Sequence, residues 1–254
     1  MNYTYQVAYL NAVKTKKIIP YQVLQDAEAN KNFQTLISLL KDYKYNGFSL
    51  FNNPEVDIRA SENFESIVFS ELQSTTSLIS KLLYDEHKWL VSWMQYFFSF
   101  KDTQELSDII IFHKNYSQKF QSLHSILCTK LVKLIIDFEN IQLFISYLIL
   151  NKTDNLMFIP EGNIKEAKLK DCFPQIESLN TYLNTTFYPQ IKLSPNLQKD
   201  NFYAYLDYYL YQLISESKFY YFTIEPIIFF FFEKLLETRR LKRIYYGIKL
   251  NLHL

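Results

Sequence analysis

Glycine is so scarce in this chain that its scarcity limits the folds the sequence can adopt. Only three glycines, Gly47, Gly162 and Gly247, occur in 254 residues. β-Sandwiches and barrels place glycine in many of their turns, whereas helices need little of it. Apolar residues also recur at helical spacing, as in the four-residue step from Trp89 to Trp93. The sequence therefore predicts an all-α fold.

The seven prolines lie between the periodic segments or at their starts, so they help to delimit the helices. The stretches YNGFSLFNNPEVD and LMFIPEGNIKE read as breaks, and FYPQIKLSPNLQKD reads as a linker. We expect a short helix opened by Pro20 and further helices over 3–18, 31–43, 62–82, 86–100, 103–118, 120–138, 140–150, 164–170, 175–187, 200–216 and 224–246.

The motifs of common enzymes are missing from the sequence. The glycines lie too far apart for a GxxxxGK loop or a GxGxxG fingerprint. None of the four histidines forms HExxH or lies near a cysteine at zinc-ligand spacing, and no DDxxD pair is present for a magnesium diphosphate. Consecutive side chains of Asp85, Glu86 and His87 would diverge on a helix. We therefore expect no catalytic residue, no metal site and no cofactor.

Charge, cysteine content and apolar runs limit the environment and the partners. A net charge of +1 argues against nucleic-acid binding. Cys128 and Cys172 lack CxxC spacing, which favours reduced core thiols in a cytoplasmic protein. The N-terminal residues do not resemble a signal peptide. The longest strongly apolar stretch without charge, WLVSWMQYFFSF, is shorter than the roughly 20 residues that a bilayer needs, so we expect no transmembrane segment.

The segment Phe222–Leu250 contains four consecutive phenylalanines, Phe229–Phe232. Side chains on a helix are splayed by about 100°, so these four sweep about 300° around the axis. Either this helix is surrounded by its own protein, or one side of it is presented to a partner. Both readings remain open from the pattern alone.

The ends of this last helix carry recognisable signals. Thr223 can cap it, Glu225 suits the positive end of the helix dipole, and Pro226 is tolerated in the first turn. Gly247 is a natural stop. Between residues 233 and 249 two anions, Glu233 and Glu237, accompany six cations, Lys234, Arg239, Arg240, Lys242, Arg243 and Lys249.

The same segment resembles a known family. IEPIIFFFFEKLLETRRLKRIYYG is similar to the C-terminal signature of the C subunits of archaeal and bacterial A/V-type rotary ATPases, which correspond to the d subunits of the eukaryotic vacuolar enzymes. The matching positions are Glu225, Pro226, Lys234, Glu237, Arg239, Leu241 and Gly247. Arg240 replaces the usual asparagine, Lys242 the usual arginine, and Arg243 falls in a normally aliphatic stretch, so the cationic cluster is heavier than in the family.

A second stretch, residues 135–164, resembles the internal motif of that family. The arginine usually found inside its helix is missing, since Ser146 and Tyr147 lie there. The positions that match are Asp137, Asn140, Pro160, Gly162 and Ile164.

The resemblance implies three related helical lobes arranged as a funnel, which we place at 1–60 with 196–254, at 61–119 and at 120–195. It implies a non-catalytic, cytoplasmic central-stalk subunit, peripheral on the membrane. One side would sit on the membrane proteolipid ring, and the cavity would grip the rotor shaft. Whether the complex moves protons or sodium, and whether it is a pump or a synthase, stays open.

Under this interpretation part of the phenylalanine run packs internally and the cationic cluster faces an acidic strip on the shaft or another lobe. The residues expected to contact partners are Arg239, Arg240, Lys242, Arg243, Phe230 and Phe231. The residues expected to have structural roles are Asp137, Asn140, Gly162, Glu225, Pro226, Glu237, Leu241 and Gly247. The rival readings are a helical scaffold or adaptor unrelated to ATPases and an all-α enzyme with a hydrophobic pocket.

Overall fold

The computed structural model describes residues 1–48, 58–98, 106–194, 199–217, 219–220 and 222–251. Within these ranges the chain forms helices and turns and no strand, which confirms the all-α prediction. The chain divides into two compact units: unit 1 is Met1–Phe100 with Lys218–Leu254, and unit 2 is Lys101–Ser217. The three predicted lobes stay a prediction. No helix within the described ranges is both long and apolar enough to cross a bilayer.

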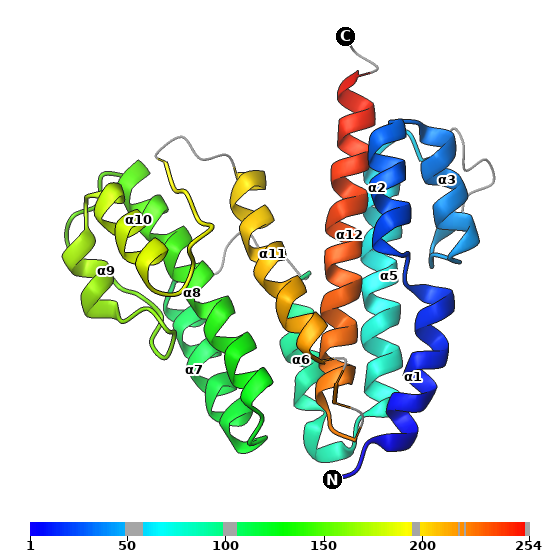
Figure 1. Cartoon of the computed structure of the whole chain (residues 1–254), viewed down its shortest axis with the longest axis horizontal. Coiled ribbons are helices and arrows are strands. Elements are labelled where there is room, and N and C mark those ends of the chain that lie inside the picture. The colour runs from blue at the N-terminus through cyan, green and yellow to red at the C-terminus, as the bar shows by residue number, and fades with distance from the viewer. Residues whose placement is uncertain (49–57, 99–105, 195–198, 218, 221, 252–254) are drawn as a thin grey trace. The chain divides into compact units, whose positions relative to one another are not determined.

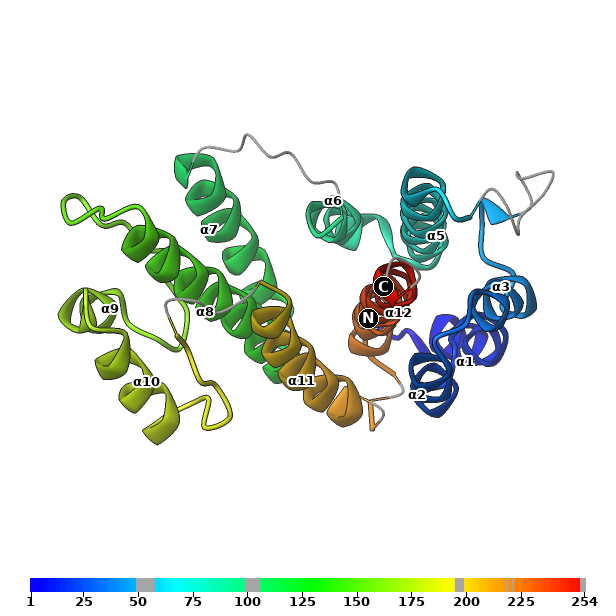
Figure 2. The ribbon, with the colours of Figure 1, turned by 90° about the horizontal axis from the view of Figure 1, so that it is seen from above.

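The last helix, α12, lies at the centre of unit 1, with α1, α2, α3 and α5 packed against it (Figures 1 and 2). α6 packs against α5. The helices of this unit are α1 (Thr4–Lys17), α2 (Tyr21–Asn30), α3 (Phe33–Asp42), α5 (Ser61–Leu82), the 3-10 turn η2 (Asp85–His87), α6 (Trp89–Tyr96) and α12 (Glu225–Asn251).

The four consecutive phenylalanines of α12 are enclosed by unit 1. Each side chain of Phe229–Phe232 is at most 1% exposed. The ring of Phe232 lies 5.6 Å from that of Trp93 on α6, and the ammonium of Lys14 on α1 lies 5.8 Å from the centroid of Phe230. Aromatic side chains around the whole helix are therefore buried by its neighbours, so the first of the two readings of this run is correct.

Both ends of α12 differ from the prediction. The helix continues through Gly247 to Asn251, because residues on either side of the glycine are anchored. Tyr245 stacks on Phe64 with ring centroids 4.1 Å apart, and Ile248 is buried. The prediction that Gly247 stops the helix is therefore wrong. Thr223 does not cap the helix, since its buried hydroxyl forms no hydrogen bond with the described part of the chain.

Unit 2 is organised around its longest helix, α8, which packs against α7 and α11, while α9 packs against α10 (Figure 1). Its helices are α7 (Leu106–Ser122), α8 (Ile126–Ile149), α9 (Glu166–Cys172), α10 (Ile176–Thr185) and α11 (Lys199–Ser217).

The predicted helices over 120–138 and 140–150 are wrong in their limits, because one continuous helix, α8, replaces them. The turn before it contains His124 with a positive φ of 51°, which ends the preceding helical run. Ser125 then caps α8 by accepting a hydrogen bond from the backbone N–H of Cys128 at 3.0 Å. The helix passes through Asn140 because the amide side chain of this residue bonds outside the helix.

Candidate partner-binding site

Lys234 is the centre of a buried polar network in unit 1. Its side chain is 0% exposed, and Nζ lies 2.8 Å from Oε1 of Glu237 and 3.2 Å from Oε1 of Glu71 on α5. The ammonium also donates to the carbonyl oxygen of Lys17 and lies 4.4 Å from the ring centroid of Tyr45. Enclosing an ammonium costs several kcal/mol unless its charge and donors are matched. Here the two carboxylates and the carbonyl provide that match.

The remaining carboxylate oxygens of the network are also bonded. Glu237 accepts hydrogen bonds from the backbone N–H of Ile19 at 2.8 Å and from the hydroxyl of Tyr45. Glu71 accepts one from the backbone N–H of Asn46 at 2.8 Å. The network thus joins α12 and α5 to the chain just beyond α1 and just beyond α3, and it fixes their register.

Two carboxylates share the single ammonium of this network. Burial raises the pKa of Glu237 above its ordinary value, and Lys234, Tyr45 and the N–H of Ile19 lower it only in part. Burial, followed by the charge of Glu237, also raises the pKa of Tyr45 well above its ordinary value. The side chains of Lys234, Glu71 and Glu237 are at most 2% exposed, so the network is enclosed within unit 1.

Sequence reasoning singled out Lys234 and Glu237 but missed their partners. Glu71 carried a usable signal, because it lies on the same face of α5 as the buried Phe64, Ile67 and Val68. An acid on an apolar helix face predicts a buried counter-charge. Tyr45 carried no comparable signal, since tyrosine is abundant throughout the chain.

Arg240 forms its contacts within unit 1. Its Nε and Nη2 atoms donate to Oε2 of Glu28 on α2 at 3.1 and 2.9 Å, and its guanidinium lies 4.2 Å from the ring centroid of Tyr21. This arrangement, with one face on an aromatic ring and two donors on a carboxylate, is typical of arginine at a structural contact. Arg240 therefore fastens α12 to α2.

Lys242 is also paired within the unit. Its ammonium bonds to Glu65 on α5, which accepts a second hydrogen bond from the hydroxyl of Tyr246 at 3.0 Å. Arg239 is half-buried and Arg243 is exposed, and both make further contacts within the chain. The predicted cationic cluster is thus divided between residues that hold neighbouring helices and residues that reach the surface.

Phe230 and Phe231, predicted to contact a partner, lie in the core with 1% and 0% of their surface exposed. We do not retain them as contact residues. Of the predicted structural residues in α12, Glu225, Glu237 and Leu241 are buried, whereas Gly247 is half-buried. Pro226 is buried in the first turn.

The second group of predicted structural residues comes together in unit 2. Asp137 of α8 accepts hydrogen bonds from the backbone N–H of Ile164 at 2.9 Å, from the amide of Asn163 at 2.8 Å and from the hydroxyl of Tyr188 at 2.5 Å. Burial raises the pKa of Asp137, and these hydrogen bonds offset the increase in part.

One turn later on α8, Asn140 fixes the same loop. Its amide donates to the carbonyl oxygen of Ile159 at 2.8 Å, and its oxygen accepts from the N–H of Ile159 at 2.6 Å. Gly162 passes directly over Asp137, where a Cβ would lie 2.2 Å from Oδ1. Asp137, Asn140 and Gly162 together attach the loop around Ile159–Ile164 to α8.

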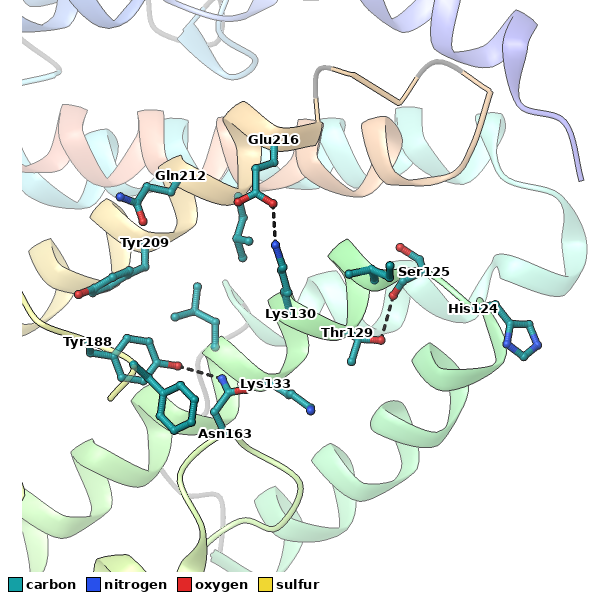
Figure 3. Close-up of a pocket in the computed structure, with 14 residues that line it drawn as sticks. His124, Ser125, Thr129, Lys130, Lys133, Asn163, Tyr188, Tyr209, Gln212 and Glu216 are labelled. Carbon is teal, nitrogen blue, oxygen red and sulfur yellow. Dashed lines mark hydrogen bonds and ion pairs between the residues drawn. The ribbon is translucent and has the colours of Figure 1, made fainter. Parts of the chain in front are cut away.

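An open groove of about 570 Å³ lies between α8 and α11 in unit 2 (Figure 3). Lys130 and Glu216 form an ion pair at 2.9 Å between the two helices. Asn163 and Tyr188, which both bond to Asp137, also line it. The described residues contain no group of acidic, histidine or cysteine side chains placed to hold a metal. Nothing on these walls selects one class of ligand.

Comparison with known proteins gives one match. The family model described as ATP synthase (C/AC39) subunit matches residues 109–253, more than half of the chain. The matched range includes Asp137, Asn140 and Gly162 of unit 2 and the whole of α12. No curated protein and no solved structure matches the chain.

Proposed function

The chain belongs to the ATP synthase (C/AC39) subunit family of the A/V-type rotary ATPases, and we propose that it is the non-catalytic central-stalk subunit that couples the rotor shaft to the membrane proteolipid ring. It would lie on the cytoplasmic side of the membrane, held there by the complex. The alternative of a scaffold unrelated to ATPases is not favoured by the family match.

The observation that carries the proposal is the way α12 is fixed. A part that transmits torque must resist shear, and large apolar contacts combined with charge pairs of defined register suit this purpose. The phenylalanines of α12 are buried against α1 and α6, and Lys234 bonds to groups from α5 and from the end of α1. Load applied to α12 would therefore pass into the rest of unit 1.

The exposed part of the cationic cluster supplies the second argument. Arg243 is exposed and Arg239 half-buried on the C-terminal half of α12. We assign them to an acidic strip on the shaft, because complementary charge fixes the orientation of two surfaces as they meet. Arg240 and Lys242 would act indirectly by holding α12 against α2 and α5.

Co-purification tests the proposal. The tagged full-length chain would be recovered from detergent-solubilised membranes of its own host, and the associated proteins identified by mass spectrometry. We expect the shaft subunits and the proteolipid in amounts comparable to the bait. Recovery without any rotary ATPase subunit, with the tag alone as control, would reject the proposal.

A further inference from the structure

Unit 2 contains a second, smaller cavity, which we call the α7–α8 cavity. Its volume is about 280 Å³, and it lies between α7, α8 and the loop at Glu161 and Gly162. Thr129 and Lys133 line both this cavity and the groove between α8 and α11, so the two spaces adjoin. The volume is far larger than a single water molecule needs.

Lys133 brings a positive charge to the α7–α8 cavity. It is half-buried on α8, and its side chain forms no ion pair or hydrogen bond with any other described residue. Lys130, three residues earlier on the same helix, is instead paired with Glu216 at 2.9 Å. Figure 3 shows Lys130 directed at Glu216 on α11 and Lys133 directed away from α11. The cavity therefore contains an ammonium group without a bonded counter-charge.

Two further donors line the cavity from α7. Ser117 and Gln121 are four residues apart, so they lie on one face of that helix. Ser117 is only 6% exposed, and its hydroxyl forms no hydrogen bond within the described part of the chain. A buried hydroxyl without a partner costs free energy, which a bound acceptor would restore. The hydroxyl of Thr129, by contrast, already donates to the carbonyl oxygen of Ser125 at 2.9 Å.

These donors select a small oxyanion. Lys133 would repel a metal cation, and the described residues hold no group of acidic, histidine or cysteine side chains that could bind one. Water could bond to Ser117 but would leave the ammonium charge unbalanced, whereas an anion balances it through charge-assisted hydrogen bonds. Phe120 and Val132 add apolar walls, which strengthen such interactions. The volume lies near the lower limit of ligand pockets, which suits phosphate better than a nucleotide.

Glu161 is the acidic residue among the described lining residues. It is exposed and lies in a turn with a positive φ of 73°. No ion pair joins it to Lys133 in the described part of the chain. Because solvent screens an exposed carboxylate, Glu161 offsets the charge of Lys133 only weakly.

We infer that the α7–α8 cavity binds a small oxyanion of phosphate size. Lys133 supplies the charge, and Ser117 and Gln121 supply hydrogen bonds. The bound anion bridges α7 and α8 beside the loop at Gly162, so it stabilises unit 2. This binding does not depend on contact with a rotary complex, so the inference and the proposed function can fail separately.

Calorimetric titration of the full-length chain with inorganic phosphate, at constant ionic strength, tests the site. We expect one saturable site per chain, with affinity lowered about tenfold or more in Lys133→Met and raised several-fold in Glu161→Gln. The matched control is Lys130→Met, which removes the neighbouring lysine that pairs with Glu216 and should leave the affinity unchanged. Equal affinity of the wild type and Lys133→Met, or no saturable binding at millimolar phosphate, would overturn the inference.

Thermal unfolding of the wild type tests the same site without a substitution. Phosphate should raise the unfolding midpoint in a saturable manner, because it binds the folded chain. Sulfate should act in the same direction, since it offers the same tetrahedral arrangement of oxygen acceptors. Sodium chloride at equal ionic strength should have a smaller effect that does not saturate. A chloride effect equal to that of phosphate would show general screening and would overturn the inference.

Discussion

A Cβ atom on Gly162 would lie 2.2 Å from Oδ1 of Asp137, so the loop backbone of unit 2 rests directly on a buried carboxylate. This closeness lets the N–H of Ile164 reach Oδ1 at 2.9 Å. In this stretch Asp137 therefore provides the hydrogen-bond acceptor, and Gly162 leaves room for the loop backbone because it has no side chain.

Gly162→Ala should destabilise the protein markedly. The new methyl group must displace either the backbone or the carboxylate, because Ile136 also lies close, 3.1 Å from the added atom. Overpacking and the weakened hydrogen bonds together predict a loss of about 2–3 kcal/mol. Urea unfolding followed by circular dichroism would measure it as a lower midpoint.

Gly247→Ala provides the matched control for this prediction. The position is helical, and a Cβ there would lie more than 4 Å from every described atom, so the same added methyl group should raise the unfolding free energy by about 0.5–1 kcal/mol. Equal losses at the two glycines would contradict our account of both.

The stability contribution of Asp137 should depend on pH. Burial raises the pKa of this carboxyl in the folded state, so the folded protein holds the proton more strongly than the unfolded chain does. The contribution is fully present below the ordinary pKa of aspartate, near 3.9, and is lost as the pH rises through the raised pKa. The unfolding free energy of the wild type minus that of Asp137→Asn should therefore decrease from acidic to neutral pH. A difference that grows with pH would contradict the stated direction.

Much of the helix pattern follows from the sequence because it depends on local periodicity. The helices predicted over 3–18, 62–82 and 200–216 correspond to α1, α5 and α11, with ends within one residue. Pro20 precedes α2 as expected. The predicted loop over 45–57 and the linker over 187–200 lie partly outside the described residues.

The errors arise where tertiary contacts override local signals. Gly247 reads as a stop, yet Tyr245 and Ile248 are buried by α5 and its surroundings and carry the helix past it. The burial of the phenylalanine run could not be decided from the sequence, since the same residues fit a helix enclosed by its own protein and a helix that presents one side to a partner. Likewise, Arg240 pairs with Glu28, a residue more than 200 positions earlier, and no local pattern reports such a pairing.

Removing the charge at the centre of the network in unit 1 should be among the most damaging substitutions. Lys234→Leu leaves Glu71 and Glu237 buried without a counter-charge, which predicts a loss of about 3–5 kcal/mol. The triple variant Lys234→Leu, Glu71→Leu, Glu237→Leu should recover only part of this loss, since no buried charge then remains but the N–H groups of Ile19 and Asn46 lose their acceptors.

The exposed pair in unit 2 offers the control. Lys130 and Glu216 are each about half exposed, so Lys130→Ala should change the unfolding free energy by less than about 1 kcal/mol. Urea unfolding of the wild type, Lys234→Leu, the triple variant and Lys130→Ala would decide the comparison. A Lys234→Leu variant as stable as the wild type would show that the network does not hold the helices together.

Charge reversal separates the arginine that holds α2 from the one assigned to a partner. Arg240→Glu would place a carboxylate against Glu28, where the wild type has two hydrogen bonds, so it should lower the unfolding free energy by about 1–2 kcal/mol. Arg243 is exposed and solvent screens its contacts within the chain, so Arg243→Glu should lower the unfolding free energy less than Arg240→Glu does. In co-purification from membranes, however, Arg243→Glu should reduce recovery of the shaft subunits, and the reduction should be larger at low salt because exposed charges are screened as ionic strength rises. Lost helicity in Arg243→Glu would place this residue among the internal contacts of unit 1 instead.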